Sequence, residues 1–600
     1  MFKKFKAEHS LSEYEFNANM FPVVSDRDFW DGFADKEYVK LAQEAIDYAW
    51  PTIKATDYME FIKTGKRAME PTHNERRSYL MLFFYAELAE NKGRFLPQIV
   101  NGLLAICEET SWCASAHWAD EIPKNLPNIT APYIDLLAAE TSEHLVSIIT
   151  LLREPLMDFC PEIIERVEYE LEYRIKSVYL AHKDYWWMGY GTRIPNNWNP
   201  WIISNLMTVF LVTEKDRTRL EASLNKMFDE LQYYYDGMPD DGGCDEGPGY
   251  WGRAGASLFE CVYQIKKATG GKLNLFNDEK LGKIGAFLKT VHVAKDYFVS
   301  VADSHYSPNA FSMIITYAFG KETGQRELMN FAAAVYRERT TNVDPYHHTN
   351  SNLRRMLYYH DFFDELKAYE PTYPVHTGVE ILPDVELAGI RCEDKLVFAK
   401  GGHNDESHNH NDVGSFTFYD GLDPILADVG IGIYTRFTFS EHRYTMIPWV
   451  KAENHTIPAF NGVGQQYGVQ YRADSFAATD DKIEISFASA YPSEAGVLDV
   501  KRVLTVNEKG MKCVDSFKFA DDTKKQTREV FVCVLPVRIE DNCAIINESF
   551  RLSASAGKLS SEFVPFEDLS LERSWKKDGM TRILFDADGV DEIEICVERI

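Results

Sequence analysis

The sequence predicts an α+β protein of several domains, with a helical N-terminal part followed by an antiparallel β part. Its 600 residues are too many for one hydrophobic core. Up to about residue 370, apolar residues recur at helical spacing, as in Leu80, Phe83 and Phe84. From about residue 380 they alternate with polar residues, as in Ile483 and Ile485, which is typical of strands.

Further segments support this division. Leu145, Ile148 and Ile149 lie on one face of a second predicted helix, and Ser415–Tyr419 reads as a strand that ends at a turn. We therefore expect a helical domain over residues 1–375 and an antiparallel β-sandwich over residues 376–600, with the boundary in YPVHTG. A small C-terminal β subdomain from about residue 520 is an open alternative.

Composition excludes some classes of function. A net charge of −28 argues against a nucleic-acid partner, which needs a basic surface. No apolar run approaches the roughly 20 residues that span a bilayer, so we expect no membrane partner. The ten cysteines are scattered without a CxxC pair, as is usual in a reducing compartment. We expect a cytoplasmic protein, or a periplasmic or secreted one if a signal peptide has been removed.

The segment GGHNDESHNHNDVGSF gathers three of the 16 histidines. On an extended backbone His408 and His410 would point to one face, roughly 6–7 Å apart, so that one could bind a metal and the other face a substrate. Asp428 and His455 follow in ILADVG and AENHTIP. Two imidazoles and a carboxylate from separate strands could form an open zinc site. A polar loop with surface histidines is the alternative.

Two loops of the helical part are rich in side chains that suit sugars. In PNNWNPW, asparagines precede an apolar helix and could simply cap it. Three asparagines beside two tryptophans equally suggest a sugar platform. The loop DDGGCDEGPGYW is expected to be tight, with Glu246 and Tyr250 as its reactive side chains. Trp112, His117 and Glu140 belong to a further patch, for which core packing is at least as good an interpretation.

Together these motifs resemble the heparinase II/III-like superfamily of polysaccharide lyases. HNHNDVGSFTFY, ADVGIGIY and ENHTIP are similar to the family's C-terminal motifs, and NNWN and EGPGYW to its N-terminal ones, in the same order. The resemblance covers roughly residues 100 to 470 and is strongest to broad-specificity glycosaminoglycan lyases. It implies an incomplete (α/α) toroid followed by an antiparallel β-sandwich. It also implies cleavage of uronic-acid glycans by β-elimination, which leaves a 4,5-unsaturated uronate.

The resemblance implies four catalytic residues. Asn197, with His408, would neutralise the substrate carboxylate, because the C5 proton is weakly acidic until that charge is offset. Tyr250 would act as acid and base, for which its pKa must be lowered. His408 could be the base for the opposite C5 epimer, and Tyr434 matches a second active-site tyrosine. Some relatives have a histidine where this chain has Trp198, so the role of that position does not carry over.

The resemblance also implies ligands. A structural divalent ion, zinc by preference with manganese or calcium as alternatives, would be held by His410, Asp428 and His455. The partner would be an acidic polysaccharide or oligosaccharide, and a homodimer is left open. The residues expected to contact the substrate are Trp112, His117, Glu140, Trp198, Asn199, Glu246, Arg253 and Arg443.

Three other functions remain open at this point. An alginate or oligoalginate lyase would use the same chemistry, because both substrates place C5–H beside a carboxylate. A metal-dependent glycan hydrolase would use the His/Asp site to activate water. A non-catalytic glycan-binding protein is the third. An unsaturated product that absorbs in the near ultraviolet separates elimination from hydrolysis and from binding alone.

Overall fold

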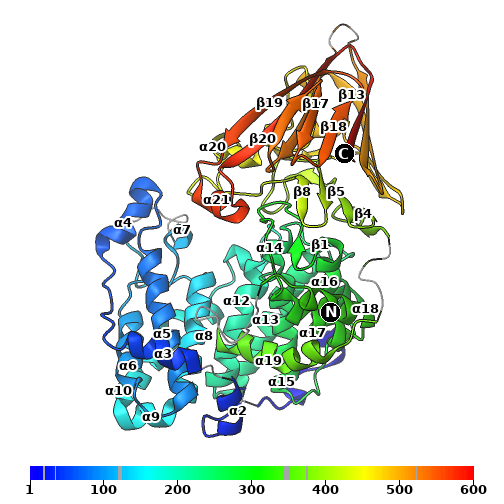
Figure 1. Cartoon of the computed structure of the whole chain (residues 1–600). Helices are drawn as coiled ribbons and strands as arrows, with labels where there is room; N and C mark the ends of the chain where they lie inside the picture. The colour runs from blue at the N-terminus through cyan, green and yellow to red at the C-terminus, as the bar shows by residue number, and fades with distance from the viewer. Residues whose placement is uncertain are drawn as a thin grey trace. The chain divides into compact units, whose positions relative to one another are not determined.

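The computed structural model describes residues 1–17, 20–33, 36–118, 125–341, 352–372, 376, 378–521, 523 and 525–600. Helices dominate up to α19 and strands from β3 onwards (Figure 1), which confirms the predicted order of helical and β parts. The predicted domain boundary falls at residues 373–378, of which 373–375 and 377 lie outside the described residues. None of the described helices is both long and apolar enough to cross a membrane.

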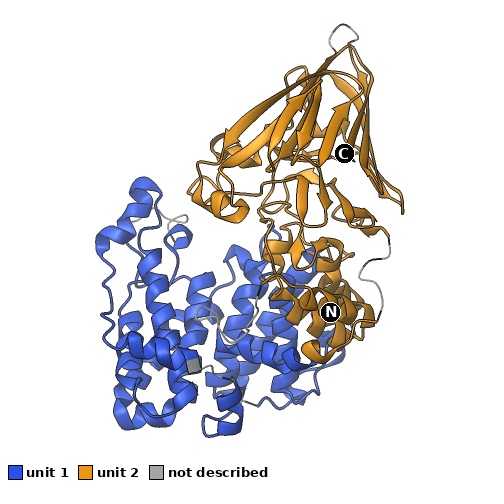
Figure 2. Cartoon of the chain, viewed as in Figure 1, with its two compact units in different colours: residues 1–237, 253–278, 343–365 blue, residues 238–252, 279–342, 366–600 orange. Residues whose placement is uncertain are grey.

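The chain forms two compact units, coloured blue and orange in Figure 2. The helical unit comprises residues 1–237, 253–278 and 343–365, and the β unit comprises residues 238–252, 279–342 and 366–600. The β unit thus includes several helices as well as the loop that carries Tyr250.

The helices of the helical unit bury their predicted apolar faces. Leu80, Phe83 and Phe84 of α5 are fully buried, and α8 begins where the Asp135 carboxylate accepts a hydrogen bond from the Ala138 N–H at 2.8 Å. The helices are α1 (Phe2–Glu8), α2 (Arg27–Phe33), α3 (Lys36–Glu44), α4 (Ala55–Thr64), α5 (Glu70–Glu90), α6 (Leu96–Cys107), α7 (Ser115–Trp118), α8 (Leu136–Leu151), α9 (Arg153–Phe159), α10 (Pro161–Leu171), α11 (Ser177–Ala181), α12 (Trp198–Thr213), α13 (Arg217–Gly237), α15 (Gly255–Ala268) and most of α19 (Leu353–Ala368).

The remaining helices belong to the β unit, as does a two-stranded ribbon. The ribbon is β1 (His292–Ala294) paired with β2 (Tyr297–Phe298), and the turn that follows it carries Asp303. The helices are α14 (Pro248–Trp251), α16 (Glu279–Thr290), α17 (Ser312–Thr323), α18 (Arg326–Arg337), α20 (Arg443–Met446) and α21 (Leu569–Trp575).

Three antiparallel sheets of the β unit share one core. Their strand orders are β3-β4-β5-β7-β8, β11-β12-β13-β14-β21-β18-β17-β16 and β19-β20-β15-β9, and β6 pairs with β10 separately. Phe418, Ile485 and Phe531, one from each sheet, belong to the same buried cluster. The strands are β3 (Glu380–Leu382), β4 (Leu387–Cys392), β5 (Lys395–Lys400), β6 (His403–Asn404), β7 (Phe416–Asp420), β8 (Asp423–Leu426), β9 (Ala459–Phe460), β10 (Gly468–Arg472), β11 (Ser475–Ala478), β12 (Lys482–Ser486), β13 (Val497–Asn507), β14 (Gly510–Phe519), β15 (Gln526–Cys533), β16 (Val537–Glu540), β17 (Cys543–Ile546), β18 (Phe550–Ala554), β19 (Lys558–Pro565), β20 (Gly579–Asp588) and β21 (Glu592–Arg599).

Candidate active site

Asp303 lies at the centre of a buried polar network in the β unit. Its Oδ2 accepts hydrogen bonds from Nδ1 of His408 at 2.6 Å and from the Tyr434 hydroxyl at 2.9 Å. Its Oδ1 accepts from Nε2 of His410 at 3.0 Å and from Nη2 of Arg443 at 2.7 Å. Burial alone would raise the pKa of this carboxyl, but the histidine hydrogen bonds and the Arg443 charge hold it well below its usual range. Asp303 is therefore an anion that positions two of the predicted catalytic residues.

The hydroxyl groups of Tyr250 and Tyr434 are hydrogen-bonded to each other. A phenol has a single proton, and Tyr434 donates its proton to the Asp303 carboxylate, which can only accept. Tyr250 is therefore the donor in its bond with Tyr434. The rings of Tyr250 and His408 also lie against each other, with centroids 4.1 Å apart. Three of the four predicted catalytic residues thus form one cluster.

Both ring nitrogens of His408 face carboxylates. Nδ1 lies 2.6 Å from Asp303, and Nε2 lies 3.1 Å from Oε2 of Glu246. Burial by itself lowers the pKa of the imidazole, but the two hydrogen bonds outweigh it and raise the pKa of His408 to about 9. His408 is therefore an imidazolium at neutral pH, and both of its N–H groups are in use.

The expectation of a lowered pKa for Tyr250 is wrong for this arrangement. Burial of the phenol raises the pKa most. The hydrogen bond with Tyr434 lowers it, and the charges of Asp303 and Glu246 raise it again, so that the net pKa of Tyr250 is raised. The pKa of Tyr434 is also raised, by burial and by the Asp303 charge. Both phenols are protonated at neutral pH, which suits a proton donor better than a base.

The histidine segment is not extended, which corrects a second expectation. Residues 405–415 form turns, and His408 has a φ of 58°, a left-handed conformation that residues with a Cβ rarely adopt. Ala302, beside Asp303, has a φ of 54°. His408 and His410 meet through the two oxygens of Asp303 rather than on one face of a strand. Such local strain persists where the surroundings impose it, and it is frequent at functional sites.

Glycines allow two loops to close around the Asp303 turn. A Cβ on Gly247, in the loop before Tyr250, would lie 2.6 Å from the carbonyl oxygen of Val301. A Cβ on Gly430 would lie 2.4 Å from that of Ser304. Both glycines have positive φ angles, 82° and 72°. The predicted tight loop therefore brings Glu246 and Tyr250 to the network.

A second buried cluster contains His410, Asp412, Asp428 and His455. One ligand atom from each of these side chains lies within 4.8 Å of the others. The three predicted metal-binding residues are thus brought together, and Asp412 joins them. Two imidazoles and two carboxylates suit zinc or manganese better than metals that prefer thiolate or thioether ligands.

The chemistry of these side chains fits a divalent ion. Among the described residues, Nδ1 of His410 and Nε2 of His455 are buried and have no hydrogen-bond partner. A buried polar atom without a partner costs about 1–3 kcal/mol, and a bound ion would remove that cost. The other nitrogen of His410 bonds to Asp303, as metal-binding histidines usually do with an outer carboxylate.

The asparagines at the start of α12 differ in their surroundings. Asn197 is buried at the N-cap position, and its side chain makes no capping hydrogen bond. Asn199 donates from Nδ2 to the backbone carbonyls of Trp187 at 2.9 Å and Glu230 at 3.0 Å. These bonds tie the helix to two other segments, so the placement of Asn199 favours a structural role over the predicted sugar contact.

Other predicted substrate residues form two small groups in the helical unit. In the first group, the ring centroids of Trp198 and His117 are 4.5 Å apart. Nδ1 of His117 lies 2.6 Å from Oδ2 of Asp135. In the second group, Oε1 of Glu140 accepts hydrogen bonds from Trp201 at 2.8 Å and Arg253 at 3.2 Å. The Arg253 guanidinium lies over the Trp201 ring, 4.3 Å from its centroid. Each group joins an aromatic face to polar groups.

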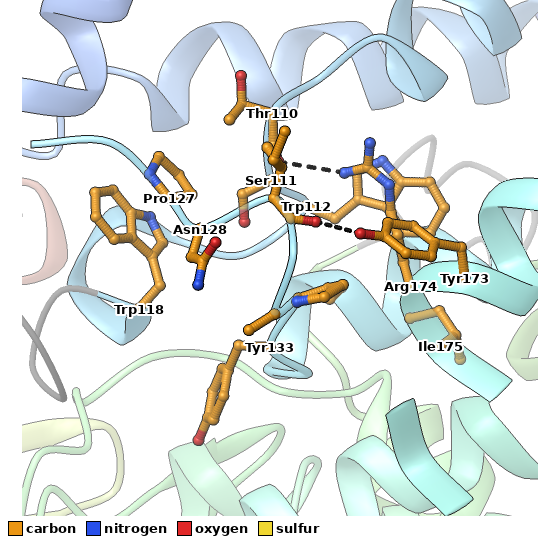
Figure 3. Close-up of a pocket in the computed structure, with 14 residues that line it drawn as sticks. Thr110, Ser111, Trp112, Trp118, Pro127, Asn128, Tyr133, Tyr173, Arg174 and Ile175 are labelled. Atoms are coloured by element: carbon orange, nitrogen blue, oxygen red, sulfur yellow. Dashed lines mark hydrogen bonds between the residues drawn. The ribbon is translucent and has the colours of Figure 1, made fainter. Parts of the chain in front are cut away.

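The position of Trp112 favours the core-packing interpretation over the predicted substrate contact. Its side chain is buried, its Nε1 donates to the carbonyl of Ile106 at 3.0 Å, and Arg174 lies 5.0 Å from its ring. It lines a cavity of about 60 Å³ beside Arg174 and Tyr133 (Figure 3).

Glu246 and Arg443, both predicted to contact substrate, lie within the network. Glu246 bonds to His408, and the Arg443 guanidinium bonds to Asp303 and to the carbonyls of Asn409 and Thr438. This placement favours positioning roles for both. Sequence reasoning did not single out Asp303. The only signal for it is a short polar run, Asp303–His305, between apolar residues.

No family model matches the sequence, and no curated protein matches it. Among solved structures, heparinase III is 11% identical, with 98% of this chain and 93% of that chain covered and a TM-score of 0.62. A mutant of the heparan sulfate lyase HepC from Pedobacter heparinus is 11% identical over 100% of this chain and 87% of that chain, with a TM-score of 0.59.

A mutant of the chondroitin AC lyase of Streptomyces coelicolor A3 is 10% identical over 96% of this chain and 82% of that chain, with a TM-score of 0.55. These likenesses confirm the predicted fold class, an incomplete (α/α) toroid followed by an antiparallel β-sandwich. The chain has the fold of heparinase III and of these two lyases.

Proposed function

We propose that this protein is a polysaccharide lyase that cleaves uronic-acid glycans by β-elimination. The observation that carries the proposal is the network of Tyr250, Tyr434, His408 and Asp303, which places two half-buried phenols against an imidazolium. The fold shared with heparinase III supports it. Elimination needs a base for the C5 proton, an acid for the departing O4 and stabilisation of the charge that develops on the carboxylate.

Tyr250 is the proposed proton donor to O4. Its raised pKa keeps the phenol protonated at neutral pH. Its bond to Tyr434, and the bond of Tyr434 to Asp303, also give its proton a path into the protein. In the resting protein a shift of both protons along this path is uphill, because the pKa of Tyr250 is raised and that of Asp303 is lowered. The shift therefore occurs only transiently during the reaction, when Asp303 holds the proton and Tyr250 is a phenolate that takes the C5 proton and delivers it to O4. The relay then returns to its starting state, so the proton count balances.

His408 is the proposed group that offsets negative charge on the uronate. It is an imidazolium held by two carboxylates, and the Nε2–Glu246 contact of 3.1 Å is longer than the Nδ1–Asp303 contact of 2.6 Å. We propose that a uronate carboxylate displaces Glu246 from Nε2, while Asp303 keeps the ring in place. In this protonation state His408 stabilises charge, and the predicted role as C5 base is not needed.

The local charge of the network differs from that of the whole chain, so an acidic substrate need not be repelled there. His408 and Arg443 carry two positive charges, and Asp303 and Glu246 carry two negative ones, so the network is neutral although the chain has a net charge of −28. In the helical unit, Asn197, Trp198, His117, Glu140 and Arg253 remain our proposed contacts to the glycan.

His410, Asp412, Asp428 and His455 would hold a structural divalent ion, zinc by preference. When bound, the ion would supply rigidity to the loop that carries His408, without taking part in the elimination. His410 links the two clusters, because one of its nitrogens faces the ligand group and the other bonds to Asp303.

A substrate panel tests the function. Hyaluronan, chondroitin, heparan sulfate and alginate are each incubated with the full chain, and the near-ultraviolet absorbance of the unsaturated product is followed. Product from one of the first three supports a glycosaminoglycan lyase, and product from alginate alone supports the alginate alternative. New reducing ends that appear without absorbance would refute elimination and indicate hydrolysis.

A further inference from the structure

Arg502 is a fully buried charged residue in the sandwich of the β unit. It lies on β13 directly opposite Asp515 of β14. Its Nε donates to Oδ1 of Asp515 at 2.8 Å and its Nη2 to Oδ2 at 2.5 Å. The rings of Phe416 and Phe487 lie 5.0 Å and 5.6 Å from the guanidinium. The paired carboxylate and the two rings hold the guanidinium in one orientation.

The remaining nitrogen of Arg502 reaches two loops. Nη1 donates to the carbonyl oxygen of Gly414 at 2.7 Å and to that of Thr456 at 2.8 Å. Gly414 lies two residues after Asp412, and Thr456 directly follows His455. These loops are far apart in sequence, and each carries members of the cluster proposed to hold the ion. One nitrogen atom therefore joins the backbones of both loops.

Sheet stability alone does not account for this arginine. A buried ion pair inside a sheet contributes little net stability compared with apolar residues of similar size. The guanidinium is planar, so one of its edges can bond to a carboxylate while another bonds to two carbonyl oxygens. The ammonium group of a lysine cannot make this set of bonds. Glu529 lies 3.5 Å away, and burial and the Asp515 charge raise its pKa, so Arg502 is balanced mainly by Asp515.

We propose that Arg502 is a positioning residue for the ion site. Anchored by Asp515, it keeps the Gly414 and Thr456 carbonyls at one nitrogen, and so keeps the loops of Asp412 and His455 at the separation that a shared ion requires. The inference rests on the proposed structural ion. It adds a residue that lies in the sandwich core and contacts none of the ligand side chains through its own hydrogen bonds among the described residues.

The test compares zinc affinity and thermal stability of full-length variants. Arg502→Lys keeps the positive charge and loses the planar guanidinium. We expect zinc affinity to be about 10-fold weaker, the lower end of the loss seen when a direct partner of a metal ligand is removed, because Arg502 holds the loops and not the ligand side chains. Asp515→Asn keeps the arginine and removes the carboxylate that anchors it, so it should also weaken zinc binding. This variant tests the inference if Arg502→Lys does not fold. Affinity is measured by competition with a chromophoric zinc chelator.

Arg354→Lys is the matched control. Arg354 is equally buried and bonds to Glu260 at 2.8 Å, but it lies in the helical unit. It should lower the melting temperature and leave the zinc dissociation constant unchanged. Wild-type affinity in both Arg502→Lys and Asp515→Asn would overturn the inference alone. A wild-type chain that binds no zinc would overturn the ion site, and the inference with it.

Discussion

The carboxylate of Asp303 joins the two clusters of the β unit, because its Oδ2 accepts from His408 at 2.6 Å and its Oδ1 from His410 at 3.0 Å. We therefore expect a disturbance of the proposed ion site to reach His408 through this side chain. The same carboxylate also accepts hydrogen bonds from the Tyr434 hydroxyl and from the Arg443 guanidinium. The position of Asp303 makes it the residue whose loss should affect both catalysis and stability.

We predict that Asp303→Asn lowers kcat by at least about 100-fold, the usual scale for loss of an acid–base element. An amide cannot balance the charges of His408 and Arg443, so thermal stability should fall as well. Initial rates by absorbance and a thermal melt measure both effects. Asp296→Asn is the control, because Asp296 is also buried but bonds to Thr340 and Thr341 instead. A control that loses as much activity would show that the effect is only structural.

Tyr250→Phe should abolish formation of the unsaturated product while leaving the fold intact, because it removes one oxygen atom and keeps the ring against His408. Tyr434→Phe should also reduce kcat, since it breaks the path from Tyr250 to Asp303. Tyr306→Phe is the control, because its hydroxyl bonds to the carbonyl of Leu422 away from the network. Near wild-type turnover in Tyr250→Phe would overturn the assignment of the acid.

His410→Ala should lower zinc content and thermal stability together. A ligand at 100 times its dissociation constant stabilises the folded state by about 2.7 kcal/mol, and the variant should lose most of that gain. The measurements are metal content by mass spectrometry and melts with and without zinc. His292→Ala removes a buried histidine of the same unit that lies outside the cluster, so it should lower stability without loss of metal. A full metal complement in His410→Ala contradicts the ligand set.

The ion pairs of Glu260 with Arg354 and Arg355 in the helical unit should make the free energy of unfolding depend on pH. Burial would raise the pKa of Glu260, but the charges of Arg355 and Arg354 lower it to about 2. A depressed pKa gives stability that is complete above the unfolded value of about 4.3 and lost as pH falls towards 2, in total about 3 kcal/mol. Urea melts of the wild type and Glu260→Gln at pH 7 and pH 3.5 measure the difference.

We expect Glu260→Gln to be 3–5 kcal/mol less stable at pH 7, because two arginines lose a buried partner, and the gap to narrow at pH 3.5. Glu221→Gln is the comparison. Glu221 pairs with Arg217 within α13 at the surface, so its loss should change stability by less than about 1 kcal/mol. A gap that stays constant with pH would contradict the depressed pKa of Glu260.

The helices and strands could be predicted from the spacing of apolar residues, and some site residues from their type. Helical periodicity at Leu80 and Phe83 and alternation at Ile483 and Ile485 are local properties of the chain, and the structure buries these residues as expected. The unusual clustering of histidines in the sequence drew attention to His410, which the structure places beside Asp428 and His455. Asp303 could not be found in this way, because its partners are 105, 131 and 140 residues away and nothing in its own neighbourhood is distinctive.

Charge states could not be predicted either. The residue type of Tyr250 suggested an acid–base group, but the direction of its pKa depends on burial and on Asp303 and Glu246, which only the fold brings to it. For Trp112, residue type left a substrate contact and core packing both open, and the fold placed the indole in the core. In both cases the residue type suggested which roles were possible. The surroundings that decide between those roles come from residues far away in the sequence.

An exposed aromatic ring beside the network leads to a last prediction. Phe439 is 61% exposed, and its ring meets those of His408 and Tyr434 edge-on, with centroids 5.2 Å away from each. A phenyl ring in this position gains little from burial, so we expect it to pack against a sugar ring of the bound glycan. Phe439→Ala should lower kcat/KM about 10-fold, equivalent to about 1.4 kcal/mol, mainly through a higher KM.

Phe563→Ala is the matched control for this prediction. Phe563 is 60% exposed on β19 of the same unit, so both changes remove one exposed phenyl ring and should barely alter the melting temperature. Initial rates over a range of glycan concentrations separate KM from kcat, and Phe439→Trp should restore most of the loss because it restores an aromatic face. If Phe439→Ala and Phe563→Ala have equal kinetics, the exposed ring has no part in binding the glycan. If kcat falls at unchanged KM, the ring instead holds His408 and Tyr434 in place.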